Sequence, residues 1–371
     1  MSVETGVLAR YSQGAEQVQA DLCCPVDYDR ELLAILPQEI IDKDYGCGDP
    51  SRYVRKGDVM LDLGSGSGKI CYMAAQLVGD SGSVIGVDMN DDMLTLARKY
   101  QPEMAEKIGS DRVHFVKGQI QDLALDLTAM NQHLAENPVR CAEDVLALRA
   151  WQEQQRKTQP LIADNSVDLV VSNCVLNLVH DSDKKQLIQE IFRVVKAGGR
   201  VAISDIVSDE PVPQHLKDDA HLWSGCISGA LLEHDFLQAF VEAGFVAVTL
   251  DKWDAQPWQV VEGIEFRAVT ITATKPQPVP CLDKGHAVIY KGSFSKVYDD
   301  EGHVFCRGQR MAVCERSYQL LTSDVYNEQF IGIAPAQEQV ANTWCHPSGT
   351  LRPVAETKSA AHSSDNPPCC C

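Results

Sequence analysis

The middle of the chain alternates short apolar runs with longer amphipathic stretches. The apolar runs are typical of buried strands, and the stretches with helical spacing between them are typical of helices. Strands that alternate with helices in this way form a parallel sheet covered on both faces. The predicted fold class is therefore α/β, with a doubly wound, Rossmann-like sheet. The strands are expected near residues 59–63, 83–88, 112–117, 167–173 and 200–205, and the helices near 67–78, 90–101, 182–196 and 233–243.

Changes in composition divide the chain into parts. A long polar stretch with helical spacing separates the third and fourth predicted strands, and we expect a solvated helical insertion at residues 122–165. A Pro-rich linker follows Lys275, and short strand-type runs come after it. The end of the chain is rich in Pro, Ser, Ala and Gln, a composition typical of disorder. The expected parts are an N-terminal arm or lid at 1–52, a main domain at 53–275, a small β-rich C-terminal domain at 276–331 and a disordered tail at 332–371 that ends in three cysteines.

A glycine-rich turn follows the first predicted strand. Asp62 ends the apolar run, and Gly64, Gly66 and Gly68 come directly after it. Glycine permits a tight turn and lets a ligand approach the backbone. The next strand ends in Asp88, at the place where a doubly wound sheet binds a ribose hydroxyl. The Gly-x-Gly-x-Gly spacing differs from that of the dinucleotide fingerprint and of the phosphate loop. The pattern therefore predicts a site for another nucleoside-bearing cofactor.

Charge excludes several classes of partner. The chain has 52 acidic and 33 basic residues, which gives a net charge of −19. This sign is opposite to the one that a phosphate backbone requires, so we expect no nucleic-acid partner. No apolar run is long enough to span a membrane, and the N-terminus lacks the pattern of a signal peptide. We therefore expect a cytoplasmic protein with a small-molecule substrate and no membrane partner.

The 14 cysteines of the chain are a second chemical signal. In a long chain without a signal peptide, cysteines indicate metal binding or catalysis rather than a disulfide scaffold. Cys174 directly follows the fourth predicted strand, Cys226 lies just past the fifth, and Cys47 belongs to the N-terminal arm. Ligands bind at the carboxyl edge of such sheets, so these cysteines are expected to converge there. A single buried cysteine is more often a small core residue, but three in marked turns favour a thiol site.

Several stretches resemble those of the arsenite methyltransferases, a family that depends on S-adenosylmethionine. The glycine loop alone is similar to the first motif of S-adenosylmethionine-dependent methyltransferases in general. The resemblance covers roughly residues 10–330. The chain departs from the family pattern in having two adjacent cysteines, Cys23 and Cys24, where one is expected, and a longer insertion after Asp122. The resembling stretches are Tyr45-Gly-Cys-Gly, Leu61-Asp-Leu-Gly-Ser-Gly-Ser-Gly, Cys71-Tyr, Gly86-Val-Asp-Met89, Ser172-Asn-Cys-Val-Leu-Asn-Leu and Trp223-x-x-Cys-x-x-Gly-Ala-Leu.

The resemblance implies a role for each part of the site. Cys174 and Cys226 would ligate trivalent arsenic in every round of methylation. Cys47 would be a third ligand, or a redox thiol that pairs with Cys23 or Cys24. S-Adenosylmethionine would donate the methyl group, arsenite–thiol adducts would be the substrate, and a thiol reductant such as glutathione or thioredoxin would be a co-substrate. The residues expected to lie against the cofactor are Tyr45, Asp62, Gly64, Gly66, Asp88, Met89, Gln119, Ile120 and Asn173.

Elementary chemistry agrees with this implication. Trivalent arsenic is a soft centre, and thiolate is the ligand suited to it. Three sulfur ligands leave the arsenic lone pair free to attack a sulfonium methyl, without a general base and with rate supplied by orientation. Two alternatives stay open. One is a methyltransferase for an organic small molecule, with structural cysteines. The other is a non-catalytic thiol protein that binds zinc or copper through Cys369–Cys371.

Overall fold

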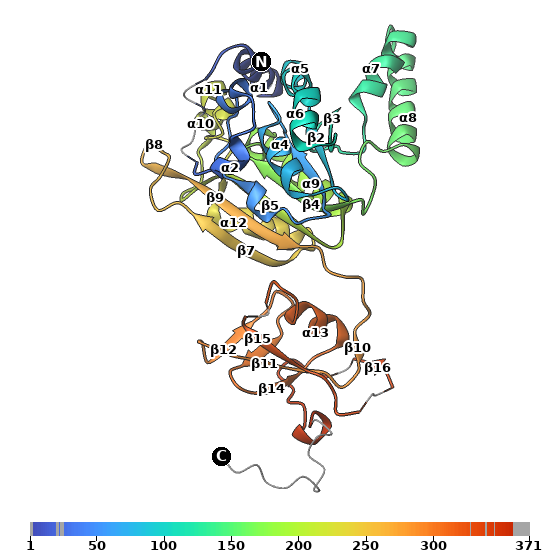
Figure 1. Cartoon of the computed structure of the whole chain (residues 1–371), viewed down its shortest axis with the longest axis vertical. Coiled ribbons are helices and arrows are strands. Elements are labelled where there is room, and N and C mark those ends of the chain that lie inside the picture. The colour runs from blue at the N-terminus through green and yellow to red at the C-terminus, as the bar shows by residue number, and fades with distance from the viewer. Residues whose placement is uncertain are drawn as a thin grey trace. The chain divides into compact units, whose positions relative to one another are not determined.

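The computed structural model describes residues 3–19, 22, 26–326, 328–337, 340–344 and 346–358. The chain has two compact units, Met1–Lys275 and Pro276–Cys371, which are described separately (Figure 1). The expected relay cysteines Cys23 and Cys24 and the terminal Cys369–Cys371 lie outside the described residues.

A mixed sheet forms the centre of the first unit. Its order within the described residues is β3-β2-β1-β4-β5-β9-β7, with β6 beside β5 and β8 beside β9. The first five strands pair in parallel, whereas β9 runs antiparallel to both β5 and β7. The predicted doubly wound α/β sheet is confirmed, with an antiparallel edge added to it. The strands are β1 (Val59–Leu63), β2 (Ser83–Asp88), β3 (Val113–Lys117), β4 (Val167–Asn173), β5 (Val195–Ser208), β6 (Leu231–Leu232), β7 (Val246–Trp253), β8 (Gln259–Val261) and β9 (Ile264–Thr274).

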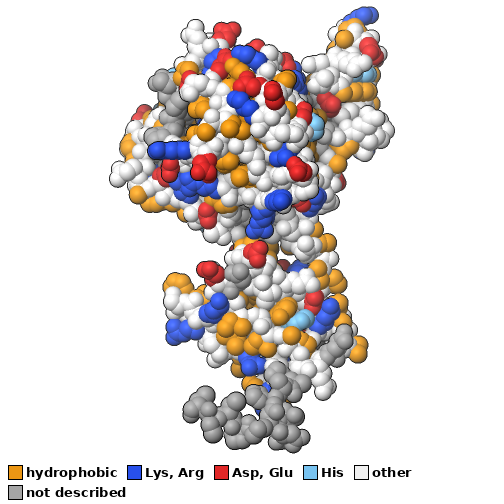
Figure 2. Space-filling model, viewed as in Figure 1, with side chains coloured by type: hydrophobic (Ala, Val, Ile, Leu, Met, Phe, Trp, Pro, Cys, Tyr) orange, Lys and Arg blue, Asp and Glu red, His pale blue; other side chains and the backbone are white. Residues whose placement is uncertain are grey.

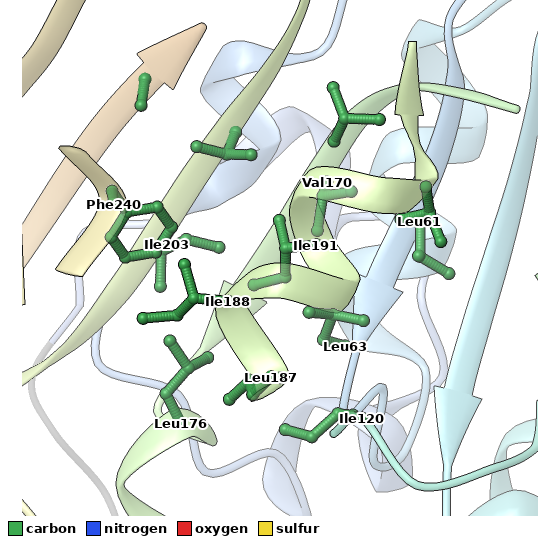
Figure 3. Packing of buried hydrophobic residues seen from close by; sticks show 14 of the residues in the cluster. Leu61, Leu63, Ile120, Val170, Leu176, Leu187, Ile188, Ile191, Ile203 and Phe240 are labelled. Atoms are coloured by element: carbon green, nitrogen blue, oxygen red, sulfur yellow. The ribbon is translucent and has the colours of Figure 1, made fainter. Parts of the chain in front are cut away.

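Alternate residues of the central strands face two separate hydrophobic layers. Leu61 of β1 joins the layer that contains α9 and α12, whereas Met60 joins the layer that contains α4, α5 and α6. Figure 3 shows the first layer, in which Leu187, Ile188 and Ile191 of α9 lie against the sheet. Both faces are therefore covered, which explains why the strands are almost continuously apolar. The helices are α4 (Lys69–Leu77), α5 (Asp91–Lys99), α6 (Gln101–Ile108), α9 (Asp181–Val194), α10 (Gln214–Lys217), α11 (Ala220–Ser224) and α12 (Glu233–Glu242), with the 3₁₀ turn η3 (Leu176–Leu178).

The N-terminal arm is more helical than its sequence suggests. Its first helix, α1, was not predicted, because Gly6 and Gly14 lower its intrinsic helix propensity. This helix is formed in contact with α5 and α11, so tertiary packing outweighs local preference. The elements of the arm are α1 (Val3–Glu16), α2 (Arg30–Leu33), α3 (Gln38–Asp42) and η2 (Pro50–Tyr53).

Two helices occupy the insertion between β3 and β4. They are α7 (Leu127–Glu136) and α8 (Ala142–Thr158), and Figure 1 shows them standing beside the sheet as a hairpin. Asp126 caps α7 by accepting hydrogen bonds from the Thr128 and Ala129 N–H groups. Among the residues described for this hairpin's helices, Gln155 alone is buried. The hairpin therefore adds little to the core.

The described part of the second unit contains small antiparallel sheets and the α-helix α13. The described sheets are β14-β11-β15, β10-β16 and β12-β13. Val288, Tyr290, Phe305, Met311 and Phe330 form the centre of its own hydrophobic cluster. The elements are β10 (Leu282–Asp283), β11 (Ala287–Tyr290), β12 (Lys296–Tyr298), β13 (Val304–Cys306), β14 (Arg310–Ala312), α13 (Glu315–Leu321), β15 (Phe330–Ile333), β16 (Asn342–Thr343) and η4 (Val354–Glu356).

The expectation of a disordered tail from residue 332 is wrong for much of that stretch. Strand β16 pairs with β10, and Arg352 pairs with Asp283 at 2.7 Å. The Arg352 side chain is only 5% exposed. The stretch is held by strand pairing and by ion pairs rather than by apolar burial, so its polar composition did not reveal it.

The surface carries charged side chains of both signs (Figure 2). Figure 2 shows acidic and basic side chains interspersed over the visible face. Within the described part of the chain, none of the helices combines the length and the apolarity needed to cross a bilayer.

Candidate active site

A pocket opens at the carboxyl edge of the parallel strands. It encloses about 1030 Å³, part of which is open to solvent. The turns that follow β1, β2 and β4 form one side, and α1 with the end of the arm forms the other. Ligands bind at this edge in doubly wound sheets. The predicted cofactor residues that line the pocket are Tyr45, Asp62, Gly64, Gly66, Asp88, Met89, Ile120 and Asn173.

Asp88 and the glycine loop hold each other in place. The Asp88 carboxylate accepts hydrogen bonds from the Gly66 N–H at 2.9 Å and from the Asn90 N–H at 2.8 Å. Gly64, Gly66 and Gly68 have φ of 68°, 50° and 87°, conformations that glycine adopts without strain. A Cβ at Gly66 would meet no atom within 4 Å. The loop therefore leaves its backbone open to a ligand beside a carboxylate.

Four carboxyl groups, from Glu4, Asp44, Asp62 and Asp88, line the pocket. Burial raises the pKa of Asp62 to about 8, although a hydrogen bond from the Cys71 thiol at 3.2 Å opposes the rise. Burial also raises the pKa of Asp88 above its ordinary value. Asp44 is paired with Lys69 at 2.5 Å. A ligand that brings positive charge into this pocket would stabilise the ionised forms of the buried carboxyls.

These residues fit S-adenosylmethionine. That cofactor carries an ammonium and a sulfonium charge, which match the carboxyl groups, and ribose hydroxyls, which match Asp88. Ser65 also lines the pocket, and its buried hydroxyl has no hydrogen-bond partner among the described residues. A bound ligand with a polar group would satisfy it.

Helix α1 lines the pocket and is held by hydrogen bonds to two separate segments of the domain. The Arg10 guanidinium donates hydrogen bonds to the His221 carbonyl at 2.8 Å and to the Ser224 hydroxyl at 3.0 Å, both in α11. At its other contact, the Asn90 side-chain amide after β2 donates to the Ser12 hydroxyl at 3.1 Å. The helix thus joins the cofactor side of the sheet edge to the segment that carries Cys226.

Two tyrosines connect this cover to the site. The Tyr45 hydroxyl donates to the Gly14 carbonyl at 3.0 Å and accepts from the Gln19 N–H at 3.1 Å. Tyr11 packs edge-on against Tyr45, and its hydroxyl lies 4.0 Å from the Cys226 Sγ. Burial raises the pKa of Tyr11, so this hydroxyl stays neutral beside the thiol.

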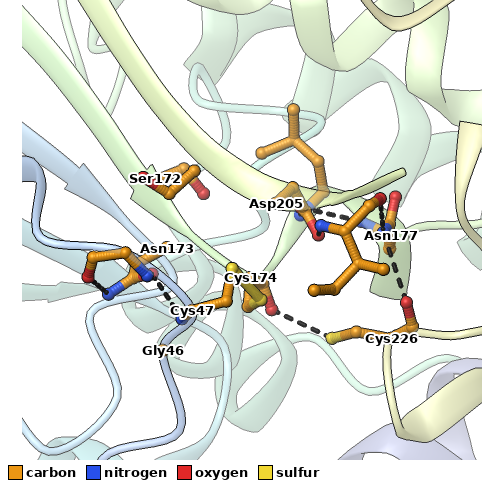
Figure 4. The surroundings of a disulfide bond; sticks show 12 residues. Gly46, Cys47, Ser172, Asn173, Cys174, Asn177, Asp205 and Cys226 are labelled. Carbon is orange, nitrogen blue, oxygen red and sulfur yellow. Dashed lines mark hydrogen bonds between the residues drawn. A yellow bond between two sulfur atoms is a disulfide. The ribbon is translucent and has the colours of Figure 1, made fainter. Parts of the chain in front are cut away.

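The three candidate cysteines converge next to the pocket (Figure 4). Cys47 and Cys174 form a disulfide with a Cα–Cα distance of 5.8 Å. The Cys226 thiol donates to the Cys174 carbonyl at 3.1 Å. Each of the three is at most 4% exposed. Cys174 and Cys226 both have φ of 61°, a region that few residues other than glycine occupy and that is enriched at functional sites. In this structure the partner of Cys47 is thus Cys174, rather than Cys23 or Cys24.

Asn173 clamps the turn that carries Cys47. Its side-chain oxygen accepts hydrogen bonds from the Cys47 N–H at 2.8 Å and the Gly48 N–H at 2.9 Å. Its side-chain nitrogen donates to the Gly48 carbonyl at 2.9 Å. A Cβ at Gly46 would lie 2.0 Å from this amide, so only glycine allows the approach. Asn173 was expected to contact the cofactor; it lines the pocket, but its amide is occupied by the turn.

Asn177 and Asp205 hold Cys226 and the turn after β4. The Asn177 side-chain nitrogen donates to the Ile206 carbonyl at 2.6 Å and to the Cys226 carbonyl at 3.3 Å. The Asp205 carboxylate accepts from the N–H groups of Leu176, Asn177 and Ile206 at 2.8–3.3 Å. Burial raises the pKa of Asp205 to about 6, against these hydrogen bonds. The two asparagines around Cys174 therefore fix the backbone positions of the other two cysteines.

Not every expected residue reaches the pocket. Gln119 is not among the described residues that line it, whereas its neighbours Gly118, Ile120 and Gln121 are. Gln119 instead pairs with Asp122 through the backbone, in an isolated antiparallel β-bridge. Sequence reasoning also assigned no role to Tyr11, Asn177 or Asp205. Asn177 belongs to the Ser-Asn-Cys-Val-Leu-Asn-Leu stretch, so its spacing from Cys174 was the available signal.

Comparisons with known proteins agree with this geometry. Residues 54–145 and 150–244 match a family model described as a methyltransferase domain. Residues 277–362 match one described as a domain of unknown function. The chain is 30% identical over 344 residues to the arsenite methyltransferase of Aquipseudomonas alcaligenes, covering 86% of this chain and 87% of that protein. It is 30% identical over 318 residues to the arsenite methyltransferase of Mus musculus, covering 82% of this chain and 74% of that one.

A solved structure is similar as well. It is that of an arsenic(III) S-adenosylmethionine methyltransferase from Chlamydomonas reinhardtii, with 28% identity and a TM-score of 0.55. The match covers 87% of this chain and 100% of that one. The resemblance seen in the sequence is confirmed, and the chain belongs to the family of S-adenosylmethionine-dependent arsenite methyltransferases.

Proposed function

We propose that this protein transfers methyl groups from S-adenosylmethionine to trivalent arsenic held by Cys47, Cys174 and Cys226. The observation that carries the proposal is the convergence of these three cysteines, from distant parts of the chain, beside the pocket formed by Asp88 and the glycine loop. Two relatives that cover most of the chain are named arsenite methyltransferases. Thiolate is the protein ligand best suited to a soft trivalent centre.

Reduction is the first step that the thiols require. Cys47 and Cys174 are joined in this structure, and they ligate arsenic only as thiols. Two equivalents of a thiol reductant, such as glutathione, open the disulfide and leave as an oxidised disulfide. Arsenite then exchanges three hydroxyl groups for three thiols and releases three molecules of water, with no change in oxidation state.

Orientation then accounts for much of the methyl transfer. S-Adenosylmethionine, when bound, supplies an electrophilic methyl group. Asp88 and the glycine loop hold the donor, while Asn173 and Asn177 fix the backbones that carry the arsenic ligands. The arsenic lone pair carries no proton, so no general base is needed. Proximity and orientation of this kind are worth several kcal/mol of barrier, roughly 7–11 kcal/mol at best.

The disulfide also fits the redox balance of the reaction. When the lone pair forms the new carbon bond, arsenic becomes pentavalent. Two of the three As–S bonds then break, their sulfur atoms join as a disulfide and leave two electrons on arsenic, and a hydroxyl group from water takes one of the freed positions, so that arsenic is trivalent again and still bound to the third thiol. Cys47 and Cys174 are close enough to do this, because they are bonded in the structure.

The direct test is turnover by the purified protein. We would incubate it with arsenite, glutathione and methyl-labelled S-adenosylmethionine and separate the products by chromatography with arsenic detection. Labelled methylarsenicals that depend on both arsenite and enzyme are expected. Label that appears in an organic acceptor, with none on arsenic, would favour the alternative of an organic substrate. Failure to bind the donor at all would favour a thiol protein without catalysis.

A further inference from the structure

The second unit brings together two cysteines that the catalytic site does not use. Cys281 lies directly before β10, and Cys314 precedes α13 as its N-terminal cap. Both are free cysteines in this structure. Helix α13, which Cys314 caps, contacts β10, which Cys281 directly precedes, and burial together with the neighbouring Cys314 side chain raises the pKa of Cys281. The fold therefore pairs two sulfur atoms from separate parts of the unit.

Backbone contacts fix both members of the pair. The Trp344 N–H at the end of β16 donates to the Cys281 carbonyl at 3.0 Å. The Val313 N–H donates to the His286 carbonyl at 3.3 Å, next to Cys314. Helix α13 also contacts β10. The two thiols are therefore placed before any ligand arrives, which lowers the entropic cost of binding to both at once.

The pair is sheltered without being sealed. Cys314 is 3% exposed, and its Sγ accepts a hydrogen bond from the Ser317 N–H at 3.4 Å. It lines a small cavity together with Ser317, His303 and Trp344. Cys281 is only partly buried. A small ligand can therefore reach one thiol from solvent and find the second beside it.

The number of ligands selects the chemistry. The one group of three metal-ligating side chains found among the described residues is Asp299, Glu301 and His303, which contains no cysteine. Structural zinc takes four protein ligands, more than this thiol pair offers. A trivalent arsenical is satisfied by two thiols, because a hydroxyl group or a carbon substituent occupies its third position. Soft thiol ligands suit it.

We propose that Cys281 and Cys314 form a second binding site for trivalent arsenicals, separate from the catalytic thiols and located in the C-terminal unit. The choice of ligand rests on the proposed function. Binding exchanges two hydroxyl groups of arsenite for two thiols: two As–O bonds and two S–H bonds break, two As–S bonds form, and two molecules of water leave. Arsenic stays trivalent, so the step needs neither an oxidant nor a reductant.

The test measures protection of Cys281 in the reduced, full-length protein. Phenylarsine oxide is the probe, because its phenyl group leaves two positions for thiols. After equilibration with the probe, free thiols are labelled with N-ethylmaleimide, and the label on Cys281 is measured by mass spectrometry of tryptic peptides. We expect the probe to protect Cys281. In Cys314→Ser, protection should need about 100-fold more probe, since the second thiol no longer acts at high effective concentration.

Matched variants make the outcome decisive. Cys306→Ser removes another partly buried cysteine of the same unit and should leave protection unchanged. Cys314→Ala is a second test if the serine variant unfolds, with circular dichroism as the check on folding. Absence of protection in the natural chain would overturn the proposal, and so would protection that persists in both Cys314 variants. Methylation is measured in parallel: loss of protection with normal methylation refutes this site alone, whereas protection without methylation refutes the proposed function alone.

Discussion

Removal of the Asn173 side chain tests whether the clamp on the Cys47 turn brings the thiols together. Asn173→Ala deletes a long hydrogen bond to the Tyr28 hydroxyl at 3.4 Å and the three hydrogen bonds of the clamp, two accepted from the Cys47 and Gly48 N–H groups and one donated to the Gly48 carbonyl. All three lie between 2.8 and 2.9 Å. The variant leaves the cysteines themselves unchanged, so any effect on them comes through their positions.

The structure sets the size of the effect. A net contribution of about 1 kcal/mol for each hydrogen bond gives about 3 kcal/mol for the clamp. If all of this energy holds Cys47 beside Cys174, the effective concentration of one thiol toward the other falls by about 100-fold, since 1.4 kcal/mol is tenfold. Water molecules that take over some of the deleted hydrogen bonds would reduce this fall in effective concentration to about tenfold.

The assay is the equilibrium of the Cys47–Cys174 disulfide with glutathione buffers of graded ratio. The disulfide fraction is read from alkylated peptides, and we expect the midpoint to move toward the reduced form by about tenfold to 100-fold. Asn177→Ala is the matched control, because its side-chain hydrogen bonds go to Ile206 and Cys226 instead. A midpoint within twofold of the natural protein would refute the role that we assign to Asn173.

Three further changes test other parts of the account. Asp88→Ala should weaken S-adenosylmethionine by one to two orders of magnitude in calorimetry, because charge-assisted hydrogen bonds of about 1.5–3 kcal/mol are lost; unchanged affinity would remove Asp88 from the site. Asp62 has a folded-state pKa of about 8, above its value in the unfolded chain. Between pH of about 4 and 8 the folded protein therefore keeps a proton that the unfolded chain has lost. The free energy of unfolding should fall over this range, by at most about 1.4 kcal/mol per pH unit. Asp62→Asn should remove that slope in urea unfolding at a series of pH values, and an unaltered slope would contradict the assignment. Removal of residues 359–371 should leave turnover at saturating arsenite nearly unchanged. Removal of residues 340–371 should lower the melting temperature of the C-terminal unit, because β16 and the Arg352–Asp283 ion pair are lost. Equal melting temperatures of the two truncated proteins would contradict this.

Local patterns were sufficient for the centre of the fold. Strand β1 ends one residue after Asp62, and β2 ends at Asp88. The two strands pair in parallel, as expected. The topological rule that ligands bind at the carboxyl edge also placed Cys174 and Cys226 near one another without any contact being visible in the sequence.

Tertiary contacts decided what the sequence did not reveal. Helix α1 contains Gly6 and Gly14, and its contact with α11 includes a hydrogen bond from Arg10 to His221, a residue 211 positions away. The antiparallel pairing of β9 with β5 is likewise a long-range choice. The amide clamp from Asn173 to Cys47 spans 126 residues. Hydrogen bonds between residues so far apart produce no repeating pattern in the amino-acid sequence.

The most direct test of the central claim feeds cysteine variants the two arsenic substrates separately. Cys174→Ser and Cys226→Ser should abolish methylation of both arsenite and monomethylarsenite, because a protonated, hard hydroxyl replaces a soft ligand. Cys47→Ser should stop the first methylation and spare the second, since monomethylarsenite has only two exchangeable positions. Products are measured by chromatography with arsenic detection. Rates equal to those of the natural protein for Cys174→Ser on either substrate would contradict the thiolate site.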